Sequence, residues 1–146
     1  MDISEYEICY YLGMGEKNNK SSVLIIDDDP NFREIFSAKL KSEGFSVFEA
    51  NGGENGLKKA LEIIPDLILL DIEMPGMSGI KVLSEMKANL NLKHLKVVFL
   101  TNHGESGEND AWLDKKFANE IGATSYIRKT DDLDKIIKEV KNILES

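Results

Sequence analysis

Three runs of four consecutive apolar residues, and one shorter segment near the end of the chain, each stop at a polar or charged side chain. The runs are residues 23–26, 67–70 and 97–100, and the shorter segment is residues 126–128. Apolar runs this short are typical of strands buried on both faces, as in a parallel sheet covered by helices. They stop at Asp27, Asp71, Thr101 and Lys129. Because ligands bind beyond the carboxyl ends of the strands in such sheets, we expect these four side chains to converge on one site.

Helical patterns alternate with the predicted strands along the chain. Strands are predicted at residues 23–26, 45–50, 67–70, 97–101 and 124–127, and helices at residues 30–43, 57–64, 80–87, 111–121 and 133–144. This alternation predicts an α/β fold of the (βα)5 type, a flavodoxin-like doubly wound parallel sheet with strand order 2-1-3-4-5. The second and fifth strands contain more polar residues than the others, so we expect them at the edges of the sheet.

The spacing of apolar residues predicts which helix faces are buried. The expected face comprises Phe32, Ile35, Phe36 and Leu40 in the first helix, and Leu57, Ala60, Leu61 and Ile64 in the second. Asp29 followed by Pro30 is typical of a helix start, so we interpret Asp29 as an N-cap rather than a metal ligand. Gly44 and Gly122 are expected to end the first and fourth helices. A long polar loop is predicted at residues 102–109.

Length and composition restrict the class of protein. The 146 residues suit one domain, which we assign to residues 22–146. Residues 1–21 are interpreted as an N-terminal extension, either flexible or, alternatively, an arm that docks a partner. A net charge of −8 argues against contact with nucleic acid. The single cysteine, the lack of a signal-peptide pattern and the lack of an apolar stretch near ~20 residues predict a cytoplasmic protein without membrane contact.

The acidic residues after the first and third strands predict a metal site. Two carboxylates about 4 Å apart repel each other by roughly 4 kcal/mol at an effective dielectric constant near 20, so Asp27, Asp28 and Asp71 would strain the fold without a cation. Mg²⁺ prefers oxygen ligands and keeps several waters. With Thr101 and Lys129 added, the set suits phosphoryl transfer, and Asp71 is the natural carboxylate nucleophile. The alternative interpretations are that the two adjacent acids are solvated turn residues and that Lys129 is a surface lysine.

Four segments resemble the signature segments of the receiver domain of bacterial two-component response regulators, the CheY-like superfamily. They are VLIIDDDP at 23–30, LILLDIEMPGMSG at 67–79, FLT at 99–101 and YIRK at 126–129. The resemblance covers residues 22–146 and implies a stand-alone phosphoacceptor of a phosphorelay, or a part of a larger regulator. The resemblance also implies a signalling domain rather than an enzyme, one that at most promotes its own phosphorylation and dephosphorylation.

The same resemblance implies a role for each matched residue. Asp71 accepts a phosphoryl group from a sensor histidine kinase or a phosphotransfer protein. Asp28, Asp71 and the backbone carbonyl of Glu73 bind Mg²⁺, and Asp27 binds it through a water molecule. Thr101 and Lys129 contact the phosphoryl oxygens. Tyr126 turns inward with Thr101 as the switch, although it could also be an ordinary edge-strand aromatic. A downstream protein is expected to bind the face formed by the fourth helix, fifth strand and fifth helix.

The chain departs from the family pattern near the site. Thr130 stands where the family usually has Pro, so we expect a trans bond before it or a local rearrangement, because a cis bond would cost about 2.5–4 kcal/mol. Asn102 stands where Ala or Gly is usual, and the loop that follows is longer. Two alternative functions remain open at this stage: a pseudo-receiver that binds partners without phosphorylation, and a Mg²⁺-dependent phosphatase.

Overall fold

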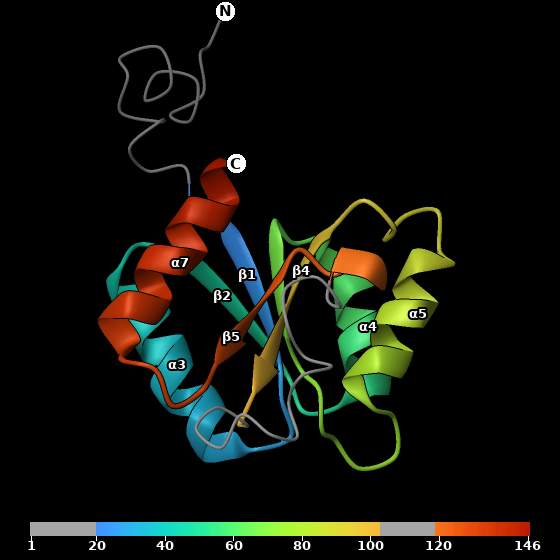
Figure 1. Ribbon diagram of the computed structural model, residues 1–146, viewed down its shortest axis with the longest axis horizontal. Helices are drawn as coiled ribbons and strands as arrows, with labels where there is room; N and C mark the ends of the chain where they lie inside the picture. Colours follow the sequence, from blue (N-terminus) through green and yellow to red (C-terminus); the bar gives the residue numbers. More distant parts are fainter. Residues whose placement is uncertain (1–19, 103–118) are drawn as a thin grey trace, which may run out of the picture.

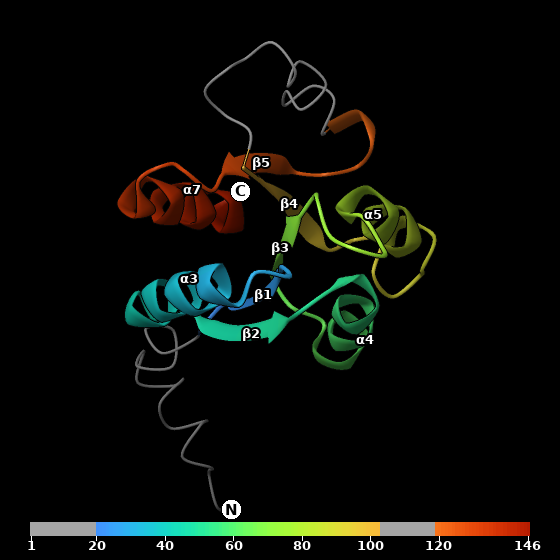
Figure 2. The same cartoon turned by 90° about the horizontal axis from the view of Figure 1, so that it is seen from below.

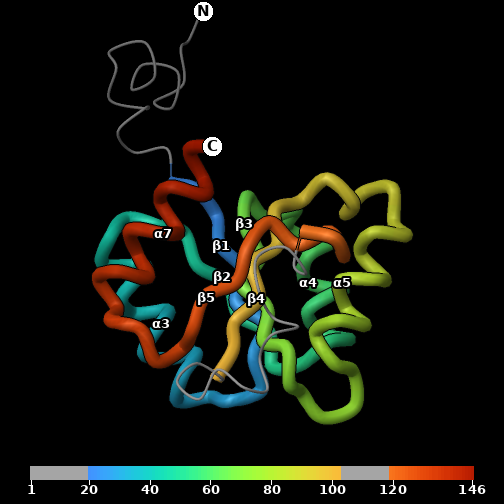
Figure 3. Tube along the Cα trace, viewed as in Figure 1, coloured from blue at the N-terminus to red at the C-terminus, as the bar shows by residue number. Residues whose placement is uncertain are grey.

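The computed structural model describes residues 20–102 and 119–146, and these residues form a five-stranded parallel sheet between helices (Figure 1). The strands are β1 (Ser22–Ile26), β2 (Ser46–Ala50), β3 (Leu67–Asp71), β4 (Lys96–Thr101) and β5 (Ser125–Arg128). The helices described are α3 (Pro30–Ser42), α4 (Gly53–Ile63), α5 (Gly79–Lys87) and α7 (Leu133–Glu145). The strand order β2-β1-β3-β4-β5 confirms the predicted topology and both predicted edge strands, and Figure 3 traces the path of the chain through it.

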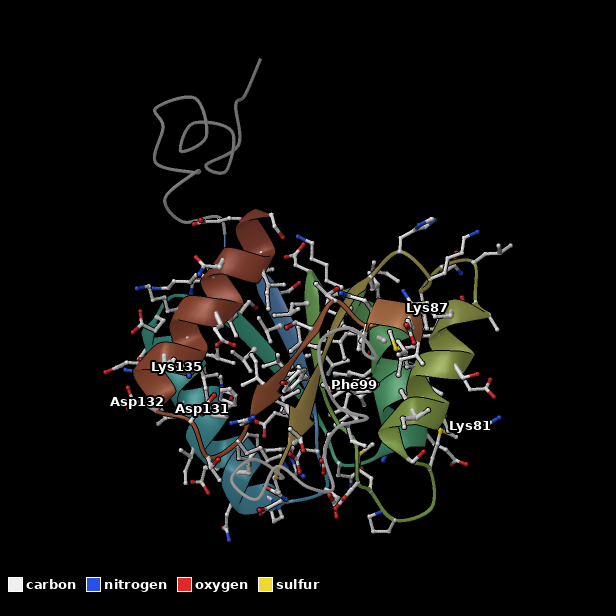
Figure 4. The ribbon with its side chains drawn as sticks, in the orientation of Figure 1. Lys81, Lys87, Phe99, Asp131, Asp132 and Lys135 are labelled. Atoms are coloured by element: carbon white, nitrogen blue, oxygen red, sulfur yellow. The ribbon has the colours of Figure 1, made fainter. Side chains whose placement is uncertain are left out.

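Helices cover both faces of the sheet. Helices α3 and α7 lie on one face, and α4 and α5 lie on the other (Figure 2). The alternation of side chains along a strand divides the core in two: Leu24 and Ile26 of β1 pack toward α4 and α5, whereas Val23 and Ile25 pack toward α3 and α7. Phe99 of β4, only 1% exposed, lies near the centre of the molecule (Figure 4). Burial on both faces explains why the central strands are uninterrupted apolar runs.

Helix α3 begins as the sequence predicts. The Asp29 carboxylate accepts hydrogen bonds from the backbone N–H groups of Asn31 and Phe32, and Pro30 occupies the first helical position. Gly44 follows the helix with a φ of +96°, a conformation that glycine adopts without strain. These contacts confirm that Asp29 is a helix cap.

The predicted buried faces of the first two helices are partly wrong. Ile35 is 57% exposed. The buried face of α3 is centred on Phe36, Ser37 and Leu40, so Ile35 lies outside its border. Helix α4 packs through Gly53, Gly56 and Ala60, and a Cβ on Gly56 would overlap the Ile26 side chain. This close approach by small residues leaves Leu61 and Ile64 44% and 47% exposed. The sequence pattern counted large apolar residues and gave no weight to glycine as a packing surface.

Several predictions fall on residues outside the described ranges. They concern most of the N-terminal extension at 1–21, the polar loop at 102–109 and most of the predicted fourth helix at 111–121. Residues 119–120, which are described, are helical, and Gly122 follows with a φ of +100°, as expected for a helix end. Within residues 20–102 and 119–146, every helix is too short or too polar to cross a bilayer.

The amino end of β1 and the last turn of α7 lie at the same edge of the sheet (Figure 1). The Lys96 ammonium, at the start of β4, donates hydrogen bonds of 2.7 Å to the carbonyl oxygens of Ile143 and Ser146. The carboxyl ends of all five strands lie at the opposite edge, since the strands are parallel. The polar residues predicted to form a site are at that opposite edge.

Candidate functional site

Three carboxylates meet where β1 and β3 end. One side-chain oxygen from each of Asp27, Asp28 and Asp71 lies within 4.8 Å of the others. Asp27 is fully buried and Asp71 is 4% exposed, whereas Asp28 faces solvent. Because β1 and β3 are adjacent, with Ile26 paired to Leu70, the residues that follow these partners are brought side by side. The structure therefore brings together the three acids that the sequence predicted, with one open to solvent.

Backbone groups in the turns orient the two buried carboxylates. Asp27 Oδ1 accepts a hydrogen bond from the backbone N–H of Asp29 at 2.9 Å, and Asp71 Oδ1 accepts one from the N–H of Glu73 at 3.3 Å. Arg33 of α3 donates from Nη1 to the backbone carbonyl of Asp27 at 2.6 Å. These bonds fix the conformation of the acidic turn after β1 and leave the other carboxylate oxygens turned toward the cluster.

Lys129 enters the cluster from the end of β5. Its Nζ lies 2.5 Å from Asp27 Oδ2 and 3.5 Å from Asp71 Oδ2, and its side chain is 7% exposed. Its backbone N–H donates to the carbonyl oxygen of Thr101 at 2.8 Å, which ties it to β4. The structure thus excludes the alternative of an ordinary surface lysine. The described residues contain no cis peptide bond, so the Lys129–Thr130 bond is trans, as expected.

Phe32 is a component of the site that the sequence analysis did not identify. Its ring centroid lies 4.5 Å from Lys129 Nζ. The sequence analysis placed Phe32 only on the buried face of the first helix. Phe32 could have been predicted from its position in the first turn of α3, four residues after Asp28, because that turn follows the acidic residues directly.

Burial sets the protonation behaviour of Asp71. Desolvation and the neighbouring Asp27 carboxylate raise the pKa of Asp71 from 3.8 to about 7, against the opposing effect of the Lys129 ammonium. One lysine therefore does not compensate the two buried acids. A cation bound among the carboxylates would lower this pKa again.

The donor set suits a hard divalent cation. The three side-chain donors are all carboxylate oxygens, the ligands that Mg²⁺ prefers. Asp27 Oδ2 is buried and accepts no hydrogen bond of favourable geometry from the described residues, although the Lys129 ammonium beside it balances its charge. The convergence of three carboxylates within 4.8 Å, with Asp28 open to solvent, fits the approach of a divalent cation from outside.

The remaining predicted residues lie at the end of β4, just after β3 and on β5. Thr101 ends β4 and is 3% exposed, and the Glu73 side chain is exposed beyond Asp71. Tyr126 of β5 is half-buried and packs against the core on the side of α4 and α5. Gly79, at the start of α5, lies so close to the backbone at the end of β3 that a Cβ would overlap the Asp71 carbonyl oxygen. The sequence analysis had predicted this helix only from residue 80 and gave Gly79 no structural role.

Comparisons with known proteins agree with this arrangement. The sequence model of the response regulator receiver domain matches residues 23–141. The chain is 33% identical to sporulation initiation phosphotransferase F of Bacillus subtilis over 123 residues, which cover 84% of this chain and 92% of that protein. The fold is similar to that of the Thermotoga maritima response regulator TrrA, solved in complex with Mg²⁺-BeF, with a TM-score of 0.68, 32% identity and coverage of 84% and 98% of the two chains.

Other relatives are much longer than this chain. It is 33% identical over 131 residues to histidine kinase P4 of Formosa agariphila, covering 89% of this chain but only 9% of the kinase. It spans 50% of the transcriptional regulatory protein ResD of Bacillus subtilis, to which it is 30% identical over 88% of its own length. The similarity is therefore to one module that occurs both in short proteins and inside long ones.

Proposed function

This chain belongs to the family of response regulator receiver domains, and on that premise we propose that it accepts a phosphoryl group on the Asp71 carboxylate with the help of Mg²⁺. Receiver domains are signalling domains, homologous to the phosphoacceptor domains of phosphorelays, and they bind Mg²⁺ at an acidic pocket. The observation that carries the proposal is the buried group of Asp27, Asp71 and Lys129 beside the exposed Asp28.

The proposed acceptor is Asp71 because its carboxylate is central and oriented. It ends the central strand β3, and the N–H of Glu73 holds Oδ1, while Oδ2 lies 3.5 Å from the Lys129 ammonium. An Asp71 oxygen would attack phosphorus once the cations neutralise the incoming phosphoryl group. In the transfer, the bond from phosphorus to a nitrogen of a phosphohistidine breaks as the bond to the Asp71 oxygen forms, and the donor histidine takes up a proton. Attack requires the ionised carboxylate, so cationic neighbours that lower the pKa of Asp71 favour the reaction.

The other residues of the site would bind the metal ion and the phosphoryl oxygens. Asp28, Asp71 and the backbone carbonyl of Glu73 would hold Mg²⁺, with Asp27 acting through a water molecule. The ion would neutralise the phosphoryl oxygens as charge develops on them. Lys129 lies closer to Asp27 than to Asp71, so we expect its ammonium to move toward the phosphoryl group when that group arrives. The Thr101 hydroxyl would donate to another phosphoryl oxygen.

The signalling step would follow from this rearrangement. A phosphoryl group shifts an equilibrium only by contacts that differ between two conformations. Thr101 and Tyr126 are the proposed switch pair, since they lie on the adjacent, paired strands β4 and β5: Thr101 ends β4 opposite Arg128, and Tyr126 stands two residues before Arg128, opposite Phe99. The proposed upstream partners are a sensor histidine kinase or a phosphotransfer protein, and a downstream protein would bind the face that includes β5 and α7. The cytoplasmic location expected from the sequence stays a prediction.

Intact mass tests the proposal directly. The protein is incubated with acetyl phosphate and Mg²⁺, beside an Asp71→Asn variant and a sample with EDTA. We expect a gain of one phosphoryl group in the wild type with Mg²⁺ and none in the two controls. A folded, Mg²⁺-binding wild type that gains nothing from acetyl phosphate or from phosphorylated kinase would contradict it and favour the pseudo-receiver. Continuous release of phosphate from an ester would favour the phosphatase.

A further inference from the structure

The phenylalanine beside the acidic cluster is held in place from two directions. Its backbone N–H donates to the Asp29 carboxylate at 3.4 Å, so the first turn of α3 fixes where the side chain starts. The Phe32 ring also packs edge-to-face on the Phe36 ring, with centroids 5.0 Å apart and planes at 67°. Phe36 is fully buried in the core layer of α3 and α7. The Phe32 ring is therefore anchored on a residue that cannot move without disturbing the core.

The Lys129 ammonium lies in contact with this ring. The distance of 4.5 Å from Nζ to the ring centroid is within the range at which a cation is attracted to the face of an aromatic ring. The ammonium is nearly excluded from solvent, because the lysine side chain is only 7% exposed. The Asp27 and Asp71 carboxylates lie on one side of it, and the ring replaces water on another. A desolvated ammonium needs such a replacement, since it loses its hydration on every side.

The two kinds of contact restrain the ammonium differently. A carboxylate binds an N–H group that points at one of its oxygens, whereas a ring face attracts the ammonium charge without requiring one N–H to point at one atom, provided that the ammonium stays over the face. The ring can therefore hold the ammonium while it pivots from Asp27, at 2.5 Å, toward Asp71, at 3.5 Å. Without the ring, the flexible four-carbon stem of lysine would leave the ammonium less restricted.

We propose that Phe32 is a positioning residue that holds the Lys129 ammonium at the acidic cluster through its aromatic face. The consequence for phosphorylation rests on the proposed function, but the contact itself does not. The ring, rather than apolar bulk alone, is the part of the side chain that matters. Removing it should slow phosphoryl uptake about three- to tenfold, which is the range expected when one desolvated cation–ring contact is lost.

Two substitutions distinguish the effect of the aromatic ring from the effect of apolar volume. Phe32→Leu keeps an apolar side chain that packs on Phe36 but has no ring face. Phe32→Tyr keeps the ring, and its hydroxyl can reach solvent because Phe32 is only half-buried. The matched control is Phe48→Leu. Phe48 is another half-buried phenylalanine near a lysine, with Lys59 Nζ 5.9 Å from its ring centroid, and it packs on the opposite face of the sheet from Phe32.

Nuclear magnetic resonance of the unphosphorylated protein tests the contact. Protons above an aromatic face resonate upfield, so the Lys129 ε-methylene should be shifted upfield from the other lysines. We expect this shift in the wild type, in Phe32→Tyr and in Phe48→Leu, and its loss in Phe32→Leu. An ordinary Lys129 shift in the wild type would overturn the proposal, whether or not the protein is phosphorylated.

The rate of phosphorylation at saturating acetyl phosphate and Mg²⁺ tests the consequence. We expect Phe32→Leu to be three- to tenfold slower, Phe32→Tyr and Phe48→Leu to match the wild type, and the Mg²⁺ affinity to be the same in all four proteins. Loss of the upfield shift with an unchanged rate, or a Phe32→Tyr rate as slow as that of Phe32→Leu, would overturn the proposal. If the wild type takes up no phosphoryl group, the proposed function fails and the Lys129 shift alone decides this inference.

Discussion

Replacing the buried Asp71 carboxylate by an amide should stabilise the protein when no metal is present. Burial and Asp27 raise the pKa of Asp71 in the folded protein to about 7, above its ordinary value of 3.8. A carboxyl group whose pKa is higher in the folded than in the unfolded protein is harder to ionise in the fold. The free energy of unfolding therefore falls as the pH rises from about 4 through about 7. Asp71→Asn cannot ionise, so the variant should not lose this stability at high pH.

The size of the effect follows from the difference between the two pKa values. That difference corresponds to an upper limit of about 4 kcal/mol at pH 8, and less than half of it is developed at pH 5. Because Lys129 remains to pair with Asp27 and the site relaxes, we expect a measured gain of about 1–3 kcal/mol at pH 8 and a distinctly smaller gain at pH 5.

Urea unfolding followed by circular dichroism, in EDTA at pH 5 and pH 8, measures this gain. Glu62→Gln is the control, because Glu62 is an exposed carboxylate on α4, and it should change the free energy of unfolding by less than about 0.5 kcal/mol at both values. Mg²⁺ should stabilise the wild type at pH 8 more than Asp71→Asn, since the variant has one carboxylate charge fewer at the proposed metal site. An Asp71→Asn variant less stable than the wild type at pH 8, or a gain larger at pH 5, would refute the argument.

Three further substitutions test other parts of the structure, each by urea unfolding at pH 8. Lys129→Met should cost about 2–4 kcal/mol in EDTA, because it leaves the buried Asp27 charge without its partner, and an equal cost in saturating Mg²⁺ would contradict this explanation. Gly79→Ala should cost about 1–3 kcal/mol, because its Cβ would overlap the backbone at the end of β3. Gly52→Ala is the control: its Cβ would meet nothing within 4 Å, and the cost should stay at about 0.5–1 kcal/mol, the effect of Ala at the N-cap of α4; equal costs at the two positions would count against the overlap. Asp29→Ala should cost about 0.5–2 kcal/mol and Asp29→Asn much less, since Asn also caps helices; a similar loss in both would show that charge, not capping, matters.

The sequence predicted the sheet and the acidic cluster because both depend on short-range patterns. Short apolar runs such as 23–26 and 67–70 are typical of central strands, and parallel strands bring the residues that follow them, Asp27 and Asp71, to one end of the sheet. The cap formed by Asp29 is likewise a local pattern.

What the sequence did not predict depends on how elements fit together. The exposure of Ile35 and Leu61 follows from the rotation of each helix on the sheet, and in α4 that rotation is set by glycine contacting Ile26, a contact that leaves no apolar signal. The contact of Phe32 with Lys129 joins residues 97 positions apart, so no local pattern could reveal it. The roles of Thr101, Tyr126 and the Mg²⁺ ligands stay predictions.

The position of the two ends of the described fold has a consequence for modular architecture. The start of β1 and the last turn of α7, secured by Lys96, lie at the edge of the sheet that faces away from the acidic cluster. A polypeptide joined at either end would leave the described fold on the side remote from Asp71, so its point of attachment would not obstruct the acidic cluster. The same geometry serves a module that makes up 92% of one relative and 9% of another.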